Sequence, residues 1–126
     1  MDSKTLQTLL ESETATIWDS LCEMYPKLCK INPPAIRLCA RLWRTAGMCH
    51  QEDRIVQLGY KFFLHSNEYQ KQMFTVILPH EIIHQADYDL FGESEKNHGH
   101  GKNWQKIMVQ YGLKPDFYHT MEISRK

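Results

Sequence analysis

The sequence lacks the features that mark several large classes of protein. It has no run near the roughly 18 consecutive apolar residues that a membrane-spanning helix needs, and its opening stretch, MDSKTLQTLLESE, has neither the basic nor the apolar segment of a signal peptide. Its fifteen basic and fifteen acidic side chains cancel, which leaves no net charge to attract nucleic acid or an anionic membrane. These absences predict a cytoplasmic protein with no membrane contact.

Cysteine pairs at metal-binding or redox spacing are also missing. The four cysteines form no CxxC pair, so neighbouring cysteines cannot build a zinc ribbon or a redox dithiol; they are Cys22, Cys29, Cys39 and Cys49. We expect reduced, partly buried thiols, as is usual inside cells. The 126 residues are 42% hydrophobic and 24% charged, which predicts a single soluble globular domain, residues 1–126, around one core.

Hydrophobic periodicity predicts a mixed α+β fold. Apolar residues spaced three and four apart predict an N-terminal amphipathic helix that stops before Pro26. Alternating apolar residues predict a strand over residues 35–43, with positions 36, 38, 40 and 42 on one face. Residues 46–50 and 54–64 are expected to form two more strands joined by a short polar turn. Together these strands predict a small three-stranded sheet.

Helical spacing returns at residue 67 and continues to about residue 90. Because proline lacks a backbone donor and crowds the preceding turn, Pro79 predicts either a kink or a new helix with Pro79 near its first position. After a polar loop, the stretch "KNWQKIMVQYG" predicts another helix, with Gly112 as its carboxyl cap. The apolar side of this helix would be formed by Trp104, Ile107, Met108 and Tyr111.

The second helical region contains the motif HExxH, which is a pattern for metal chemistry. His80 and His84 are one helical turn apart, so both imidazoles can reach one cation. Glu81 lies about 100 degrees round the helix and can take a proton from an attacking water rather than bind the metal. A catalytic zinc site uses three protein ligands and keeps one position open, so a third ligand is required.

The third ligand is expected in the glycine-rich stretch "NHGHG". His98 and His100 are the two candidates, and we favour His100 because Gly99 and Gly101 let the backbone turn tightly on both sides of it. His98 would then point to solvent or support a ligand through a hydrogen bond.

Basic residues are unevenly distributed along the chain. Residues 24–51 contain no acid, whereas residues 81–95 contain five acids and no base. The basic side chains of the first range are Lys27, Lys30, Arg37, Arg41 and Arg44. This range can face the phosphates of nucleic acid, with Trp43 as a base-stacking platform, or it can be an ordinary solvated strand face with Trp43 packed in the core.

Several blocks of sequence together resemble the SprT-like domain family, which includes bacterial SprT and the Spartan-type proteases that degrade proteins crosslinked to DNA. The blocks are "RTAGMC", "VILPHEIIHQADYDLFG", "HGKNW" and "YHTMEI", and the last three come in the order that the family has. The likeness covers nearly the whole chain, from the first helix to about residue 123.

The resemblance implies a gluzincin-like fold, in which a small three-stranded sheet packs with an N-terminal helix, the HExxH helix and a following helix. It implies that His80, His84 and His100 bind zinc and that Glu81 is the general base. His119 matches a recurring family histidine, which could hydrogen-bond a ligand, steady the oxyanion or simply pack. The implied activity is that of a zinc-dependent endopeptidase acting on proteins bound or crosslinked to DNA.

The chain also departs from the family pattern. Lys102 and Asn103 stand where many relatives have Pro-Glu or Lys-Glu, and no cysteine-rich zinc ribbon follows the domain as it does in bacterial SprT. Contact with single-stranded DNA would therefore use the domain surface, through Arg37, Arg41, Trp43 and Arg44, or a partner protein. Two alternatives stay open: a zinc-stabilised DNA-binding or adaptor module with vestigial activity, and a regulatory peptidase that cuts one partner without DNA.

Overall fold

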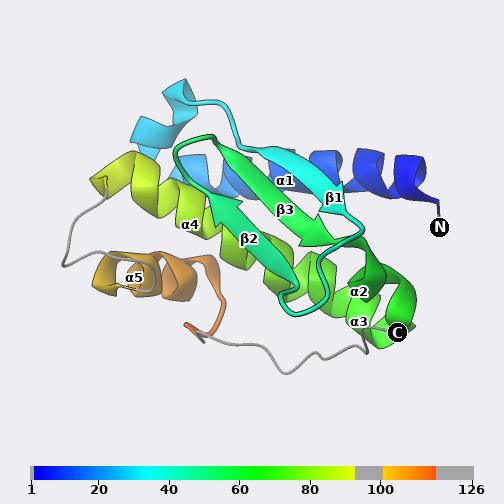
Figure 1. The fold of residues 1–126 in the computed structure, drawn as a ribbon. Coiled ribbons are helices and arrows are strands. Elements are labelled where there is room, and N and C mark those ends of the chain that lie inside the picture. Colours follow the sequence, from blue (N-terminus) through cyan, green and yellow to red (C-terminus); the bar gives the residue numbers. More distant parts are fainter. Residues whose placement is uncertain (1, 93–100, 116–126) are drawn as a thin grey trace.

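The computed structural model describes residues 2–92 and 101–115 and has the mixed α+β architecture that the sequence predicts. One small sheet forms a layer, and helices α1 (Ser3–Met24) and α4 (Leu78–Phe91) lie against each other and against one face of this sheet (Figure 1). Helix α5 (Lys102–Tyr111) packs on α4. The helix with the HExxH motif is therefore enclosed by the sheet, α1 and α5.

Helix α1 ends before Pro26 and buries one face, as its sequence predicts. Asp2 caps its amino terminus, where the Asp2 carboxylate accepts a hydrogen bond of 2.7 Å from the backbone N–H of Thr5. The buried side chains recur every three or four residues; they are Leu6, Leu10, Thr14, Ile17, Trp18 and Leu21. The helix ends at Met24, and Pro26 begins a 3₁₀ helix (Pro26–Lys30).

The sheet has three strands, as predicted, in the order β1-β3-β2. Strands β2 (Gly47–His50) and β3 (Ile55–Gly59) form the expected antiparallel hairpin, and β1 (Ala35–Cys39) pairs with β3 in parallel. Strand β2 is thus an edge strand, and among the described residues no other strand pairs with its outer edge.

Two strands end earlier than the sequence predicts. The first was predicted over residues 35–43 but ends at Cys39, because its partner β3 ends at Gly59, opposite Cys39. The third was predicted over residues 54–64, but its second half is helix α2 (Tyr60–His65).

The adjacent phenylalanines of α2 explain this second error. Phe62 and Phe63 are both buried, and neighbouring residues of a strand would point to opposite faces of a sheet that the described helices cover on one face only (Figure 1). A helical turn lets both rings reach the core.

The helical region before the motif is divided into three segments. Helix α3 (Asn67–Gln72) is followed by a π-helical turn (Met73–Ile77), in which the N–H of Leu78 bonds to the carbonyl of Met73. Helix α4 then begins with Pro79 at its second position. Of the two predicted alternatives, the new helix is confirmed, and the wider turn accommodates the proline ring, which would crowd the carbonyl four residues earlier.

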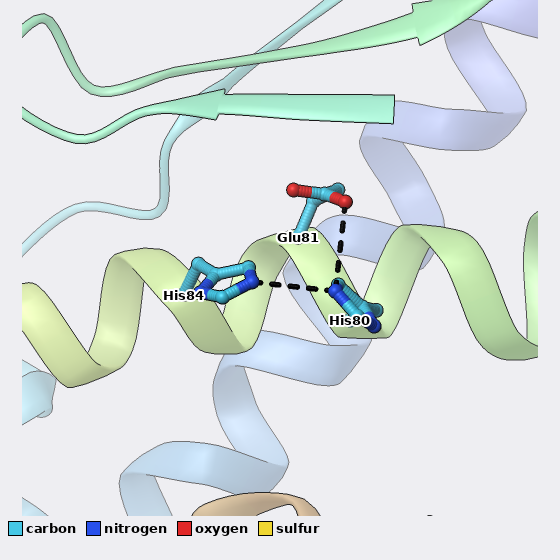
Figure 2. A group of neighbouring side chains, drawn as sticks. All are labelled: His80, Glu81 and His84. Atoms are coloured by element: carbon cyan, nitrogen blue, oxygen red, sulfur yellow. Dashed lines mark hydrogen bonds and ion pairs between the residues drawn. The ribbon is translucent and has the colours of Figure 1, made fainter. Parts of the chain in front are cut away.

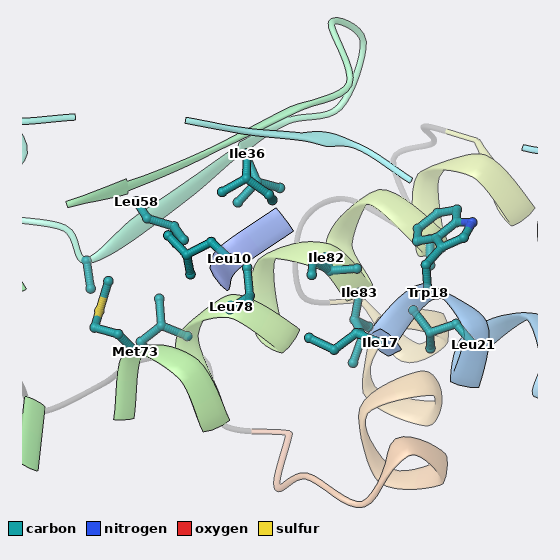
Figure 3. Close-up of a cluster of buried hydrophobic side chains, with 14 of the residues drawn as sticks. Leu10, Ile17, Trp18, Leu21, Ile36, Leu58, Met73, Leu78, Ile82 and Ile83 are labelled. Carbon is teal, nitrogen blue, oxygen red and sulfur yellow. The ribbon is translucent and has the colours of Figure 1, made fainter. Parts of the chain in front are cut away.

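Apolar side chains from the sheet, α1 and α4 fill the space between these layers (Figure 3). Trp104, Ile107 and Met108 of α5 join this core, as predicted, and Gly112 ends α5 with a left-handed φ of 106°. None of the helices among the described residues is long and apolar enough to cross a membrane.

Candidate metal centre

His80 and His84 point the same way from the first two turns of α4. Their Nε2 atoms face each other at 3.2 Å (Figure 2). A tetrahedral zinc ion with Zn–N bonds of about 2.0–2.1 Å holds two nitrogen ligands about 3.3 Å apart. The two imidazoles therefore fit a shared zinc ion.

Glu81 stands beside this pair and points toward the sheet (Figure 2). Its Oε2 atom is 3.9 Å from Nε2 of His80, and the ligand atoms of His80, Glu81 and His84 all lie within 4.8 Å of one another. Gly47 of β2 covers the Glu81 side chain so closely that a Cβ at position 47 would lie 3.0 Å from Cγ of Glu81. The Glu81 carboxylate is thus held between helix α4 and the edge strand β2.

This enclosure changes the acid–base behaviour of Glu81. Burial raises the pKa of the Glu81 carboxyl from its ordinary value of 4.5 to about 8, because the charged form is desolvated. A general base works best with a pKa near the working pH, and a cation bound between the imidazoles would favour the carboxylate. The site therefore suits proton transfer near neutral pH.

The raised pKa of Glu81 predicts that metal-free protein loses stability as the pH rises. Because the carboxyl of Glu81 has a higher pKa in the folded than in the unfolded chain, its protonation contributes to the free energy of unfolding. This contribution is complete below about pH 4.5 and is lost as the pH rises from 4.5 to about 8. Glu81→Gln should remove this component, so the variant should exceed the parent in unfolding free energy at pH 8 by roughly 2–5 kcal/mol. Urea denaturation of chelator-treated protein at pH 5 and pH 8 measures this; equal pH dependence in parent and variant would contradict it.

Trp104 packs against both histidines. Its ring stacks on that of His84, with centroids 5.0 Å apart and an interplanar angle of 15°, and meets the ring of His80 edge-on at 4.9 Å. The side chain is fully buried. The sequence predicts Trp104 on the apolar side of α5 but not its contact with the imidazoles; the one hint is that Trp104 belongs to the "HGKNW" block that resembles the SprT-like family.

The cysteines are free thiols and take no part in the site. Cys22, Cys39 and Cys49 are partly buried, as expected, whereas Cys29 is exposed. Cys49 of β2 interacts electrostatically with Glu81, and its Sγ lies 3.7 Å from Oε1 of Gln85. Burial, followed by the charge of Glu81, raises the pKa of the Cys49 thiol to about 12, so this thiol stays protonated near neutral pH.

The remaining predicted site residues fall into two groups. His98, His100 and His119 lie outside the described residues, so their predicted roles stay predictions.

The predicted DNA contacts are on β1 and the segment after it: Arg37, Arg41 and Arg44 are exposed, and Trp43 is half-buried. The guanidinium of Arg44 lies 5.0 Å from the Trp43 ring centroid, so it covers part of this ring.

A sheet packed over a helix with two convergent histidines and a neighbouring carboxylate defines a mixed α+β protein with a candidate metal-binding motif. The sequence model of the SprT-like family matches residues 20–123, and the chain belongs to that family.

Similar curated proteins are each named Protein SprT. The one from Pseudomonas fluorescens (strain SBW25) is 32% identical over 84 residues, and those from Pseudomonas putida (strain GB-1) and Pseudomonas entomophila (strain L48) are 29% identical over 84 residues. Each match covers 66% of this chain and 48% of the relative, so the chain spans about half the length of these proteins. No solved structure matches the chain.

Proposed function

We propose that the chain is a zinc-dependent endopeptidase of the SprT-like family that cleaves proteins bound or crosslinked to DNA in the cytoplasm. The observation that carries this proposal is the pair of Nε2 atoms 3.2 Å apart, with the buried carboxylate of Glu81 beside them. A site that only stabilises a fold has no use for such a carboxylate, since structural zinc sites close all four positions with ligands. The sheet lying over the metal helix also suits a gluzincin-like arrangement.

The metal would be held by His80, His84 and His100. Support for His100 comes from the residue after it: Gly101 is the amino cap of α5, the helix whose Trp104 packs against both imidazoles. Bound zinc would polarise the peptide carbonyl and lower the pKa of water to about 7. Nitrogen ligands of this kind also accept manganese or cobalt, so zinc itself is part of the proposal.

Glu81 would transfer the protons of the reaction. Its carboxylate takes a proton from the attacking water and gives it to the amine that leaves when the peptide bond breaks. The enclosure of Glu81 by Gly47 and the neighbouring core keeps bulk water from competing for that proton. In this proposal His119 steadies the oxyanion.

The outer edge of β2 is the proposed binding site for the substrate backbone. This strand lies directly over Glu81, and its outer edge carries backbone donors and acceptors that no described strand satisfies. An extended peptide can add to such an edge through main-chain hydrogen bonds, which makes binding nearly independent of side chains. Cleavage of unrelated proteins held on DNA requires this kind of recognition.

The DNA contact is proposed on the sheet face that none of the described helices covers. Arg37 projects from this face, in register with Gln57 of β3 and, beyond it, Met48 of β2. Arg41 and Arg44 follow in the connection to β2, and all three arginines are exposed.

Replacing these three arginines with alanine should weaken binding of single-stranded oligothymidine. If each contacts one phosphate, the slope of log affinity against log salt should fall by about 2, because each lost contact removes about 0.7 from it. Fluorescence anisotropy at several salt concentrations measures this. The matched control is alanine at three exposed lysines on helices away from the sheet face, namely Lys4, Lys61 and Lys106. Equal effects in both triple variants, or no binding by the parent at low salt, would contradict the proposed DNA contact.

The test of the proposed function is cleavage of fluorescently labelled casein by the zinc-loaded chain, with and without single-stranded oligothymidine. The proposal predicts zinc-dependent cleavage that DNA stimulates. Cleavage that DNA does not change would favour the regulatory peptidase. Zinc and DNA binding without cleavage would favour the adaptor module.

A further inference from the structure

Helix α4 also buries polar side chains that lie outside its pair of histidines. Glu81, Gln85 and Asp89 are four residues apart, so their side chains form one polar stripe along the helix. Gln85 is completely buried, and the Asp89 side chain is only 7% exposed. Buried polar groups are costly unless they are paired, so the partners of this stripe are informative.

The partner of Asp89 is Arg54, in the turn of the β2–β3 hairpin. Nη1 of Arg54 donates to both carboxylate oxygens of Asp89, at 2.5 and 2.7 Å, and Nη2 donates to the carbonyl oxygen of Asn32. Arg54 adopts a left-handed backbone conformation, with φ of 58°, and is the one non-glycine residue with positive φ among the described residues. Such a conformation is costly for a residue with a Cβ, and the side-chain contacts of Arg54 contribute to offsetting that cost.

Gln85 connects this ion pair to the hairpin. Its Nε2 donates to the carbonyl of Gln51, at 3.1 Å, and to Oδ1 of Asp89, at 3.0 Å, while its Oε1 accepts from the Cys49 thiol at 3.7 Å. Because Gln85 directly follows the metal ligand candidate His84, the hairpin is tied to the same helical turns that carry the site.

The two ends of β2 are therefore fixed to α4 in different ways. Near the turn, polar bonds hold residues 49–54 on Gln85 and Asp89; at the other end, Gly47 lies against Glu81 by packing alone. Without the polar bonds at its turn, the hairpin would be held by the β1–β3 ladder and by packing, which would let the edge strand β2 shift over Glu81.

We propose that Arg54, Gln85 and Asp89 are positioning residues that set the placement of β2, the proposed substrate-binding edge, relative to Glu81. This inference rests on the proposed peptidase function. The three residues touch neither the substrate nor the metal; they act through the hairpin.

The test compares Asp89→Asn with the parent in labelled-casein cleavage, zinc content and hydrogen exchange of the β2 amides. The amide keeps the shape of the carboxylate but removes its charge, so the hairpin should loosen while the metal ligands remain. We expect kcat/KM to fall by roughly 10–100-fold, because small displacements of reacting groups have effects of this size. Zinc content should not change, exchange in β2 should accelerate, and Asp89→Glu, which keeps the charge, should recover most of the activity.

Leu6→Ala provides the matched control for lost stability. Leu6 is a buried residue of α1 outside the polar stripe and the hairpin, so this variant should lower the Tm with kcat/KM within about twofold of the parent, measured well below the Tm. Parent-like kcat/KM in Asp89→Asn, or an equal loss in Leu6→Ala, would overturn the positioning role alone. A parent that cleaves no protein in the presence of zinc and DNA would instead overturn the proposed function.

Should Asp89→Asn fail to fold, Arg54→Lys replaces it. Lysine keeps the positive charge but has a single nitrogen, whereas arginine uses Nη1 for Asp89 and Nη2 for Asn32. The same loss of kcat/KM with retained zinc supports the proposal, and parent-like kcat/KM overturns it.

Discussion

Replacing Glu81 with glutamine is expected to abolish protein cleavage while leaving zinc bound. The side chain keeps its size between α4 and Gly47, but an amide cannot take a proton from water. His80 and His84 are unchanged, so the nitrogen ligands remain. Loss of a general base lowers the rate by about 100-fold or more. Initial rates on labelled casein, with zinc content determined on the same samples, measure both halves of the expectation.

The matched control for this variant is Glu68→Gln, which makes the same chemical change at an exposed position of α3. It should cleave casein at the parent rate. If Glu81→Gln also cleaves as fast as the parent, Glu81 is not the base, and the proposed chemistry is wrong.

Replacing Trp104 with alanine is the second change with a large expected effect. The fully buried indole packs against both imidazoles, so its removal leaves a cavity behind the candidate metal site. Truncation of a buried tryptophan costs about 3–5 kcal/mol of unfolding free energy. Loss of support for ligand orientation should also weaken zinc binding by roughly 10–100-fold. Urea denaturation of the metal-free protein and competition with a chromogenic chelator measure the two effects.

Two further variants separate packing from ligand support at this position. Ile107→Ala removes another buried side chain of α5 and should lower stability, but the folded protein should bind zinc as the parent does. Trp104→Phe keeps an aromatic ring and should lose less zinc affinity than Trp104→Ala. Equal zinc affinity in Trp104→Ala and Ile107→Ala would show that the stacked ring does not support the ligands.

The sequence predicts those elements of the fold whose signals are local. Helix α1 and helix α5 follow from apolar spacing and from the residues that end them, Pro26 and Gly112. The hairpin follows from two apolar stretches around a polar turn. These features depend on residues within a few positions of one another, which is why periodicity and capping rules locate them.

The errors arise where distant residues decide the structure. The alternation of β1 continues beyond Cys39, but the strand stops where its partner stops, and that partner is identified only once the chain has folded. Helix α2 replaces a predicted strand because Phe62 and Phe63 both need the core. Local pattern cannot show which faces of a sheet the helices will cover.

The candidate site also has residues that local spacing predicts and contacts that it does not. The spacing of His80, Glu81 and His84 predicts their convergence, since one helical turn brings them together whatever surrounds it. The contact of Trp104 and the ion pair of Arg54 with Asp89 join separate elements, and no spacing rule reveals them. The polar stripe along α4 is visible in the sequence, but its partners are not.

The central claim is a zinc ion shared by His80 and His84, and element-specific metal analysis of the purified protein tests it most directly. We expect about one zinc per chain in the parent, as in other sites with two helical imidazoles and one further ligand, and loss of that zinc in His84→Ala. A parent that binds no metal when zinc is supplied, or a His84→Ala variant that retains the full amount, would contradict the account.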